Sequence, residues 1–119
     1  MYNGTIIKES LENESVLENI KKSNMRVVKI DNPAPDQPSV WTLYDFIVED
    51  QNVDSIAKTF SDALKKGTWY IDMNNGTKFY VVFSGRVFKR EKNDTVENDT
   101  AKEYGRSLGI PEKQLSWKV

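Results

Sequence analysis

The chain contains neither cysteine nor histidine. Thiol chemistry, histidine-based nucleophilic triads and ordinary zinc sites are therefore excluded, because each of them needs one of these side chains. The sequence also has no glycine-rich phosphate-binding loop and no metal-ligand spacing. Carboxylates remain as acid-base groups, and the absence of cysteine fits a reducing cytosol.

Long apolar runs are absent as well: no stretch approaches the roughly 20 residues that span a bilayer. Residues 1–8 lack a basic segment followed by an apolar run, so we expect a cytoplasmic protein without a membrane partner. Lys and Arg total 17 against 18 for Asp and Glu, which gives a net charge of -1. The net charge therefore gives no electrostatic attraction to a polyanion, and nucleic acid is not expected as a partner.

The 119 residues predict a single α+β domain over residues 1–119. Strands are expected at 26–30 and 40–49, and three more within 67–88. Whether residues 5–22 form a first strand and a short helix is left open. Helices are expected over 53–64, capped by Asn52 or Asp50, and over 95–108. These elements make a mainly antiparallel sheet of about five strands, with two main helices packed on it in two layers.

Buried residues can be assigned in two of these elements and in the segment after the last helix. The strand at 40–49 is apolar on both faces, which is typical of an interior strand. The last helix is expected to bury Val96, Ala101, Tyr104 and Leu108. Trp117 is expected to dock on the domain, because a terminal tryptophan seldom stays free in a small domain.

The first hairpin within 67–88 has two alternative registers. A three-residue loop at Asn74-Asn75-Gly76, closed by Gly76 at positive φ, segregates the apolar side chains better than a two-residue loop does. It sets Ile71 opposite Phe79 on one face and Asp72 opposite Lys78 on the other.

The second hairpin is predicted at Ser84-Gly85, where a tight turn follows a β-rich run. It sets Val81 opposite Phe88 and Val82 opposite Val87.

Four segments together resemble a group of small, uncharacterised bacterial cytosolic proteins. They are WTLYDF at 41–46, WYID at 69–72, FYVVFSGRVF at 79–88 and YGRSLGIPEKQLSW at 104–117. The resemblance covers most of the chain from Trp41 onward and implies a bacterial cytosolic origin. It implies no activity, so no catalytic residue is carried over.

Three groups of acidic residues are candidates for chemistry. Glu49, Asp50 and Asp54 could ligate Mg²⁺, although capping of the following helix explains them better. Asp45 and Asp72 lie in apolar strands, where burial could raise a carboxyl pKa, but a solvated face with Asp72 paired to Lys78 is the favoured interpretation.

The third group is a polar run that partly matches a calcium loop. Asp94, Asn98 and Asp99 lie there, but the glycine and the distal glutamate of that motif are missing. We therefore expect a polar loop and a helix cap.

One stretch is densely basic and lies beside two tyrosines that are candidates for exposure. This candidate partner or anion surface comprises Tyr70, Tyr80, Arg86, Lys89, Arg90 and Lys92. Positive charge beside aromatic rings can bind nucleic acid, yet charged side chains also protect the edge of a sheet from aggregation, which is the favoured interpretation.

We therefore expect a non-enzymatic domain without cofactor or metal, which binds a protein partner or a second copy of itself. The alternatives are an anion or nucleic-acid module using residues 86–92, and an enzyme based on carboxylates. A deep pocket lined by Asp45 or Asp72 would favour the enzyme, a flat apolar patch the binding domain, and a continuous basic groove the nucleic-acid module.

Overall fold

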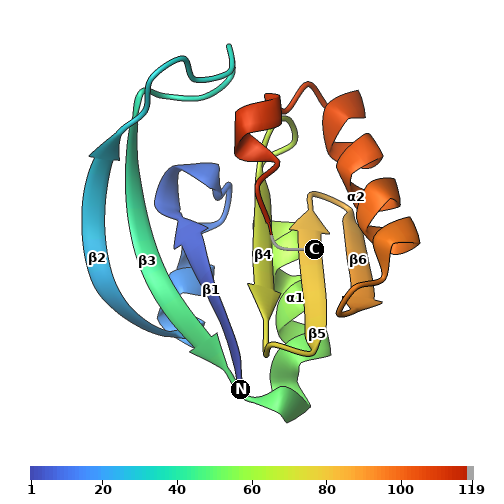
Figure 1. The fold of residues 1–119 in the computed structure, drawn as a ribbon. Coiled ribbons are helices and arrows are strands. Elements are labelled where there is room, and N and C mark those ends of the chain that lie inside the picture. Colours follow the sequence, from blue (N-terminus) through green and yellow to red (C-terminus); the bar gives the residue numbers. More distant parts are fainter. Residues whose placement is uncertain (118–119) are drawn as a thin grey trace.

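The computed structural model describes residues 1–117, which form a sheet in the order β2-β3-β1-β4-β5-β6 (Figure 1). The strands are β1 (Tyr2–Ile7), β2 (Lys21–Lys29), β3 (Val40–Val48), β4 (Tyr70–Asn74), β5 (Lys78–Phe83) and β6 (Arg86–Glu91). The helices are α1 (Val53–Ala63) and α2 (Thr95–Ser107), with short 3-10 turns η1 (Lys8–Ser10), η2 (Glu14–Asn19), η3 (Asp50–Asn52) and η4 (Glu112–Gln114).

The α+β class and the antiparallel sheet are confirmed, since neighbouring strands all pair antiparallel. The strand count of about five is wrong. Residues 2–7, part of which lay in the undecided range 5–22, form β1, which inserts between β3 and β4 and makes the sheet six-stranded. Asn13 caps the short turn η2, where its side chain accepts a hydrogen bond from the Ser15 amide.

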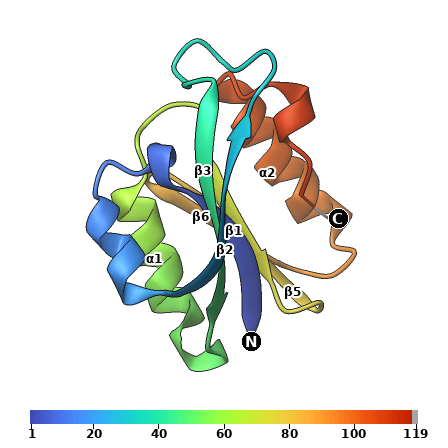
Figure 2. The same cartoon turned by 90° about the vertical axis from the view of Figure 1, so that its left-hand side faces the viewer.

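The two helices lie on opposite faces of the sheet, which corrects the expected two-layer arrangement (Figure 2). Helix α1 buries its apolar stripe in one core and α2 contributes to a second core. The physical reason is that β5 is apolar on both faces: five of its six residues are buried. A strand of this kind needs cover on both sides.

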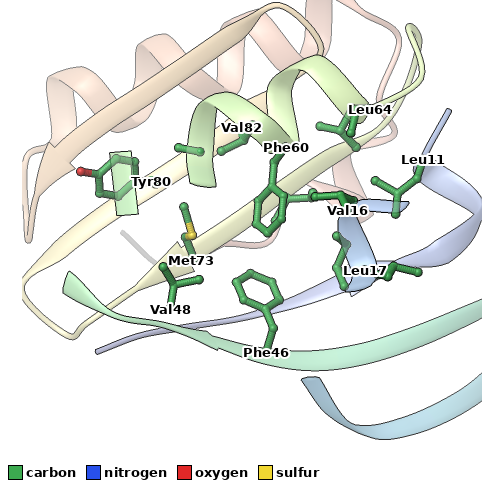
Figure 3. Close-up of a cluster of buried hydrophobic side chains, with 14 of the residues drawn as sticks. Leu11, Val16, Leu17, Phe46, Val48, Phe60, Leu64, Met73, Tyr80 and Val82 are labelled. Carbon is green, nitrogen blue, oxygen red and sulfur yellow. The ribbon is translucent and has the colours of Figure 1, made fainter. Parts of the chain in front are cut away.

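The larger core surrounds Phe60 of α1, whose side chain is fully buried (Figure 3). Its ring meets that of Phe46 on β3 edge to face, with 5.3 Å between ring centres. Apolar residues of β4 and β5 close the cluster from the other side, including Met73 and Val82. Helix α1 is thereby fixed across both halves of the sheet.

The smaller core forms between α2, the C-terminal segment and the strands β5 and β6. The Tyr104 ring meets the Phe83 ring edge to face, with 5.0 Å between ring centres, and Ala101 of α2 is buried in the same core. Trp117 docks as expected: it is buried, and its indole nitrogen donates a hydrogen bond of 2.9 Å to Asn98. The predicted burial of Val96 is wrong, because 75% of its surface is exposed.

The first hairpin adopts neither of the two registers considered. Met73 lies opposite Tyr80 and Asp72 opposite Val81, so Asp72 is not paired with Lys78. The Asn75 side chain accepts hydrogen bonds from the amides of Thr77 and Lys78 and closes the turn around Gly76. Gly76 does have the predicted positive φ, at 89°.

The second hairpin and the pattern of β3 are as predicted. Val81 lies opposite Phe88 and Val82 opposite Val87. Strand β3 is interior, between β2 and β1, and its residues alternate between the two faces of the sheet.

Candidate functional site

The sheet face opposite α1 is covered by α2 and the C-terminal segment only over β4, β5 and β6 (Figure 2). Over β1, β2 and β3, no helix of residues 1–117 covers this face, which we call the open face (Figure 1). Two adjoining depressions lie on this open face, with volumes of about 560 and 390 Å³. They share Thr5 and Asp72 at their junction, and Asp45 lines the larger one. The two strand carboxylates singled out from the sequence thus come together on one surface.

The Asp45 carboxylate is held by three hydrogen-bond donors. Thr5 donates at 3.0 Å, Arg26 at 3.1 Å and Asn24 at 3.3 Å. The Thr5 hydroxyl, followed by the other two donors, holds the Asp45 pKa below its usual value. Asp45 therefore remains ionised and fully engaged, and it is a poor proton acceptor.

Asp72 has a different environment. It is half-buried in the middle of β4, and burial raises its pKa above the usual value. No lysine or arginine within residues 1–117 forms an ion pair with it, and no side chain there donates a hydrogen bond to it. Its carboxylate is thus available to a group from outside the chain.

Aromatic rings form one end of the smaller depression. Trp41 and Trp69 pack at 5.3 Å between ring centres, and Tyr70 stands beside them. The Tyr70 hydroxyl donates a hydrogen bond to the Gln114 carbonyl oxygen. Burial, with the charge of Asp72 as a smaller cause, raises the Tyr70 pKa to about 12. Tyr70 is therefore neutral and fixed, and it acts as a wall of the depression.

The basic stretch of β6 divides between the two faces of its strand. The Arg86 guanidinium lies over the Phe88 ring at 4.7 Å on the α2 side, and buried Arg90 lies 4.5 Å from the centre of the Phe79 ring. Lys89 is exposed on the α1 side. A continuous basic groove would need these charges on one face.

The remaining members of that predicted surface are also dispersed. Lys92 is exposed beyond the end of β6. Tyr80 was a candidate for exposure, and this is wrong: only 2% of its surface is accessible, because its ring packs against Tyr2. Its hydroxyl donates to Asp54 at 2.6 Å, and Lys89 approaches the same carboxylate at 3.3 Å.

Three of the other acidic candidates, Asp50, Asp54 and Asp94, have structural partners. Asp54 bonds to Tyr80 and Lys89, and Asp50 forms an ion pair of 2.8 Å with the amino group of Met1. The side chain of Asn52, which precedes α1, does not make the expected cap. Asp94 caps α2 through the Glu97 amide at 3.1 Å. Within residues 1–117, no three carboxylates gather as metal ligands would.

A second surface, at the edge strand β2, was not predicted from the sequence. Eight of its nine residues are exposed and the other is half-buried. Met25 and Val27 are 58% and 61% exposed, and Val40 of the neighbouring β3 is 47% exposed. A register shift between Ser23 and Arg26 puts a bulge in the strand.

None of the helices within residues 1–117 has the length and apolarity needed to cross a bilayer. Comparison of the chain with protein families, with curated proteins and with solved structures finds no match to any of them.

Proposed function

We propose that this protein is a non-enzymatic binding domain that takes an extended segment of a protein partner onto the β2 edge of its sheet. The observation that carries the proposal is the exposed apolar surface of Met25 and Val27 on a long edge strand. An edge strand presents unpaired backbone groups, and an added strand satisfies them while its side chains cover the apolar patch.

The charges of β2 indicate the chemistry of the partner. Lys21 and Lys22 stand at one end of the strand and Lys29 at the other, and β2 contains no acidic residue. Arg26, between the apolar residues, is already paired with Asp45 at 3.1 Å. An extended segment that is apolar in the middle and acidic at both ends complements this arrangement in either direction.

The same charges argue against a second copy as the occupant. Antiparallel pairing of two β2 strands along their whole length would set Lys21 of one copy directly opposite Lys29 of the other, at both ends of the pair. Like charges on directly opposed residues destabilise a sheet, and the bulge further weakens continuous self-pairing. We therefore favour a different protein over self-association.

The two alternative functions have weaker support. A depression lined by both Asp45 and Asp72 is what a carboxylate enzyme would need, but the oxygens of Asp45 are occupied by donors, and Asp72 then lacks a partner base. For the nucleic-acid module, Arg86 and Lys89 point to different faces of β6.

Fluorescence anisotropy with the labelled peptide Glu-Glu-Thr-Ile-Val-Val-Thr-Glu-Glu tests the proposal. Saturable binding is expected, with none for the peptide that has lysine in place of every glutamate. The double variant Lys21→Glu, Lys29→Glu should weaken binding by about tenfold or more. The matched double variant Lys65→Glu, Lys66→Glu changes the charge equally at exposed positions outside β2 and should bind normally. Equal binding of both peptides would overturn the proposal.

A further inference from the structure

We propose that the smaller depression on the open sheet face is a binding site for a protonated primary amine on an unbranched alkyl chain, with Asp72 as its counter-ion. The depression lies on the face of the sheet, and Asp72 stands on β4, separated by two strands from the backbone edge of β2, although Arg26 of β2 lines the depression as well. The site therefore does not depend on the function proposed above.

The first reason is that the Asp72 carboxylate has acceptor capacity that the chain leaves unused. It sits half-buried at the junction of the two depressions, and within residues 1–117 only its own backbone amide bonds to it. A half-buried carboxylate with a single backbone donor keeps unsatisfied acceptor capacity, which costs folding free energy. An ammonium group would supply both the opposite charge and the hydrogen-bond donors.

The second reason is the wall beside this carboxylate. Trp41, Trp69 and Tyr70 line the depression together with the aliphatic side chains of Ile7 and Leu43. Trp41 and Trp69 are buried, with 9% and 3% of their surface exposed, so only a small part of each ring borders the depression, and apolar side chains of this kind pack on methylene groups. The Asp72 carboxylate suits the ammonium group of an alkyl amine, and the aromatic and aliphatic side chains suit its methylene chain.

The third reason concerns the charged side chains around the depression, which limit the charge that a ligand can carry. Arg26 and Lys113 also line the depression, and Arg26 is committed to Asp45 at 3.1 Å. Asp72 is thus the single carboxylate there without a cation within residues 1–117. A second positive charge on the ligand would be repelled by Arg26 or Lys113. The site therefore prefers a monocation, such as the side chain of a lysine, over a free diamine.

Titration of the ¹⁵N-labelled protein with Nα-acetyl-lysine methylamide, whose ε-amine is free, tests this inference by NMR. Saturable shifts are expected at the Trp41 and Trp69 indole groups and at the Thr5 amide. Nα-acetyl-norleucine methylamide, which has the same chain without the amine, should leave them unchanged. Putrescine should bind more weakly than the lysine derivative.

Asp72→Asn should lower the affinity for the lysine derivative by about tenfold or more, because it removes the charge and keeps the shape. Asp62→Asn, which removes an exposed carboxylate from α1 on the other face, is the matched control and should bind as the unaltered chain does. The inference is overturned if the norleucine derivative gives the same shifts, if Asp72→Asn binds normally, or if no saturable shift occurs.

Discussion

The Tyr80 hydroxyl donates a hydrogen bond of 2.6 Å to the Asp54 carboxylate, which joins the middle of β5 to the first turn of α1. Lys89 reaches the same carboxylate from β6 at 3.3 Å. One exposed acidic side chain thus connects a helix to two strands. The contact also explains why Tyr80 can be buried, since its polar end still has a partner.

Replacing Tyr80 by phenylalanine removes this hydrogen bond and keeps the ring. We expect the free energy of unfolding to fall by about 1 kcal/mol, measured by urea denaturation. The hydrogen bond from Tyr80 is the main reason that the Asp54 pKa lies below its usual value. That pKa should therefore rise in Tyr80→Phe, as followed by NMR titration, and an unchanged pKa would show that the hydrogen bond is absent in solution.

Asp45 and Asp54 should contribute to the loss of folding stability at low pH. Both have folded-state pKa values below the unfolded value of 3.8. Their contribution is therefore present above that value and is lost as the pH falls through the folded pKa values. Denaturation curves from pH 6 to about 2 should show falling stability, with a shallower fall in Asp45→Asn. An equally steep fall in that variant would contradict the assignment to Asp45.

The contribution of Asp72 to stability should change with pH in the opposite direction to that of Asp45 and Asp54. Its folded pKa is raised above the unfolded value of 3.8, so its favourable contribution is present below that value and is lost as the pH rises through the folded pKa. Asp72→Asn avoids this loss. The variant should be more stable than the unaltered chain at pH 7, with a smaller difference at pH 3, in urea denaturation at both pH values. A variant less stable at pH 7 would mean that the carboxylate has a stabilising partner.

Because β1 approaches its neighbours closely, replacing Gly4 by a larger residue should destabilise the protein. A Cβ atom there would lie 2.5 Å from the Asp72 carbonyl oxygen and 2.6 Å from the Phe46 ring. Gly4→Ala should cost about 2 kcal/mol of unfolding free energy through overpacking. Gly76→Ala is the comparison, because its Cβ meets open space and only the positive φ is strained, at a cost of about 1 kcal/mol. A smaller loss for Gly4→Ala than for Gly76→Ala would contradict this packing.

Oligonucleotide binding should be undetectable at physiological salt. The net charge is -1, and the basic residues of β6 are distributed over both faces of the strand. Fluorescence anisotropy with labelled single- and double-stranded oligonucleotides over a salt series checks this. Salt-sensitive micromolar binding that Lys89→Glu abolishes, with the circular dichroism spectrum intact, would instead support the nucleic-acid module.

Local signals predicted most of the elements but not the pairing of β4 with β5. The register was predicted by placing the apolar residues on a single face, and that criterion fails here because α1 and α2 cover opposite faces. The turn is instead stabilised by hydrogen bonds from backbone amides to the Asn75 side chain. Such bonds depend on turn geometry that periodicity does not contain.

The candidate site was predictable only in part. Asp45 and Asp72 were identified as unusual because they interrupt apolar strands, but their meeting on one face depends on β1 inserting between β3 and β4. The exposure of Met25 and Val27 was not predictable, because an edge strand and an interior strand share the same β-branched and apolar composition.

The central claim is that a partner segment adds a strand at β2, and hydrogen exchange of the ¹⁵N-labelled protein measures this most directly. In the free protein, the outward-facing amides of residues 21–29 should exchange rapidly, because they lie at the sheet edge. With saturating Glu-Glu-Thr-Ile-Val-Val-Thr-Glu-Glu, alternate amides along β2 should become protected while those of β6 keep their free rates. Unchanged exchange along β2 in the saturated complex, or protection confined to β6, would contradict the account.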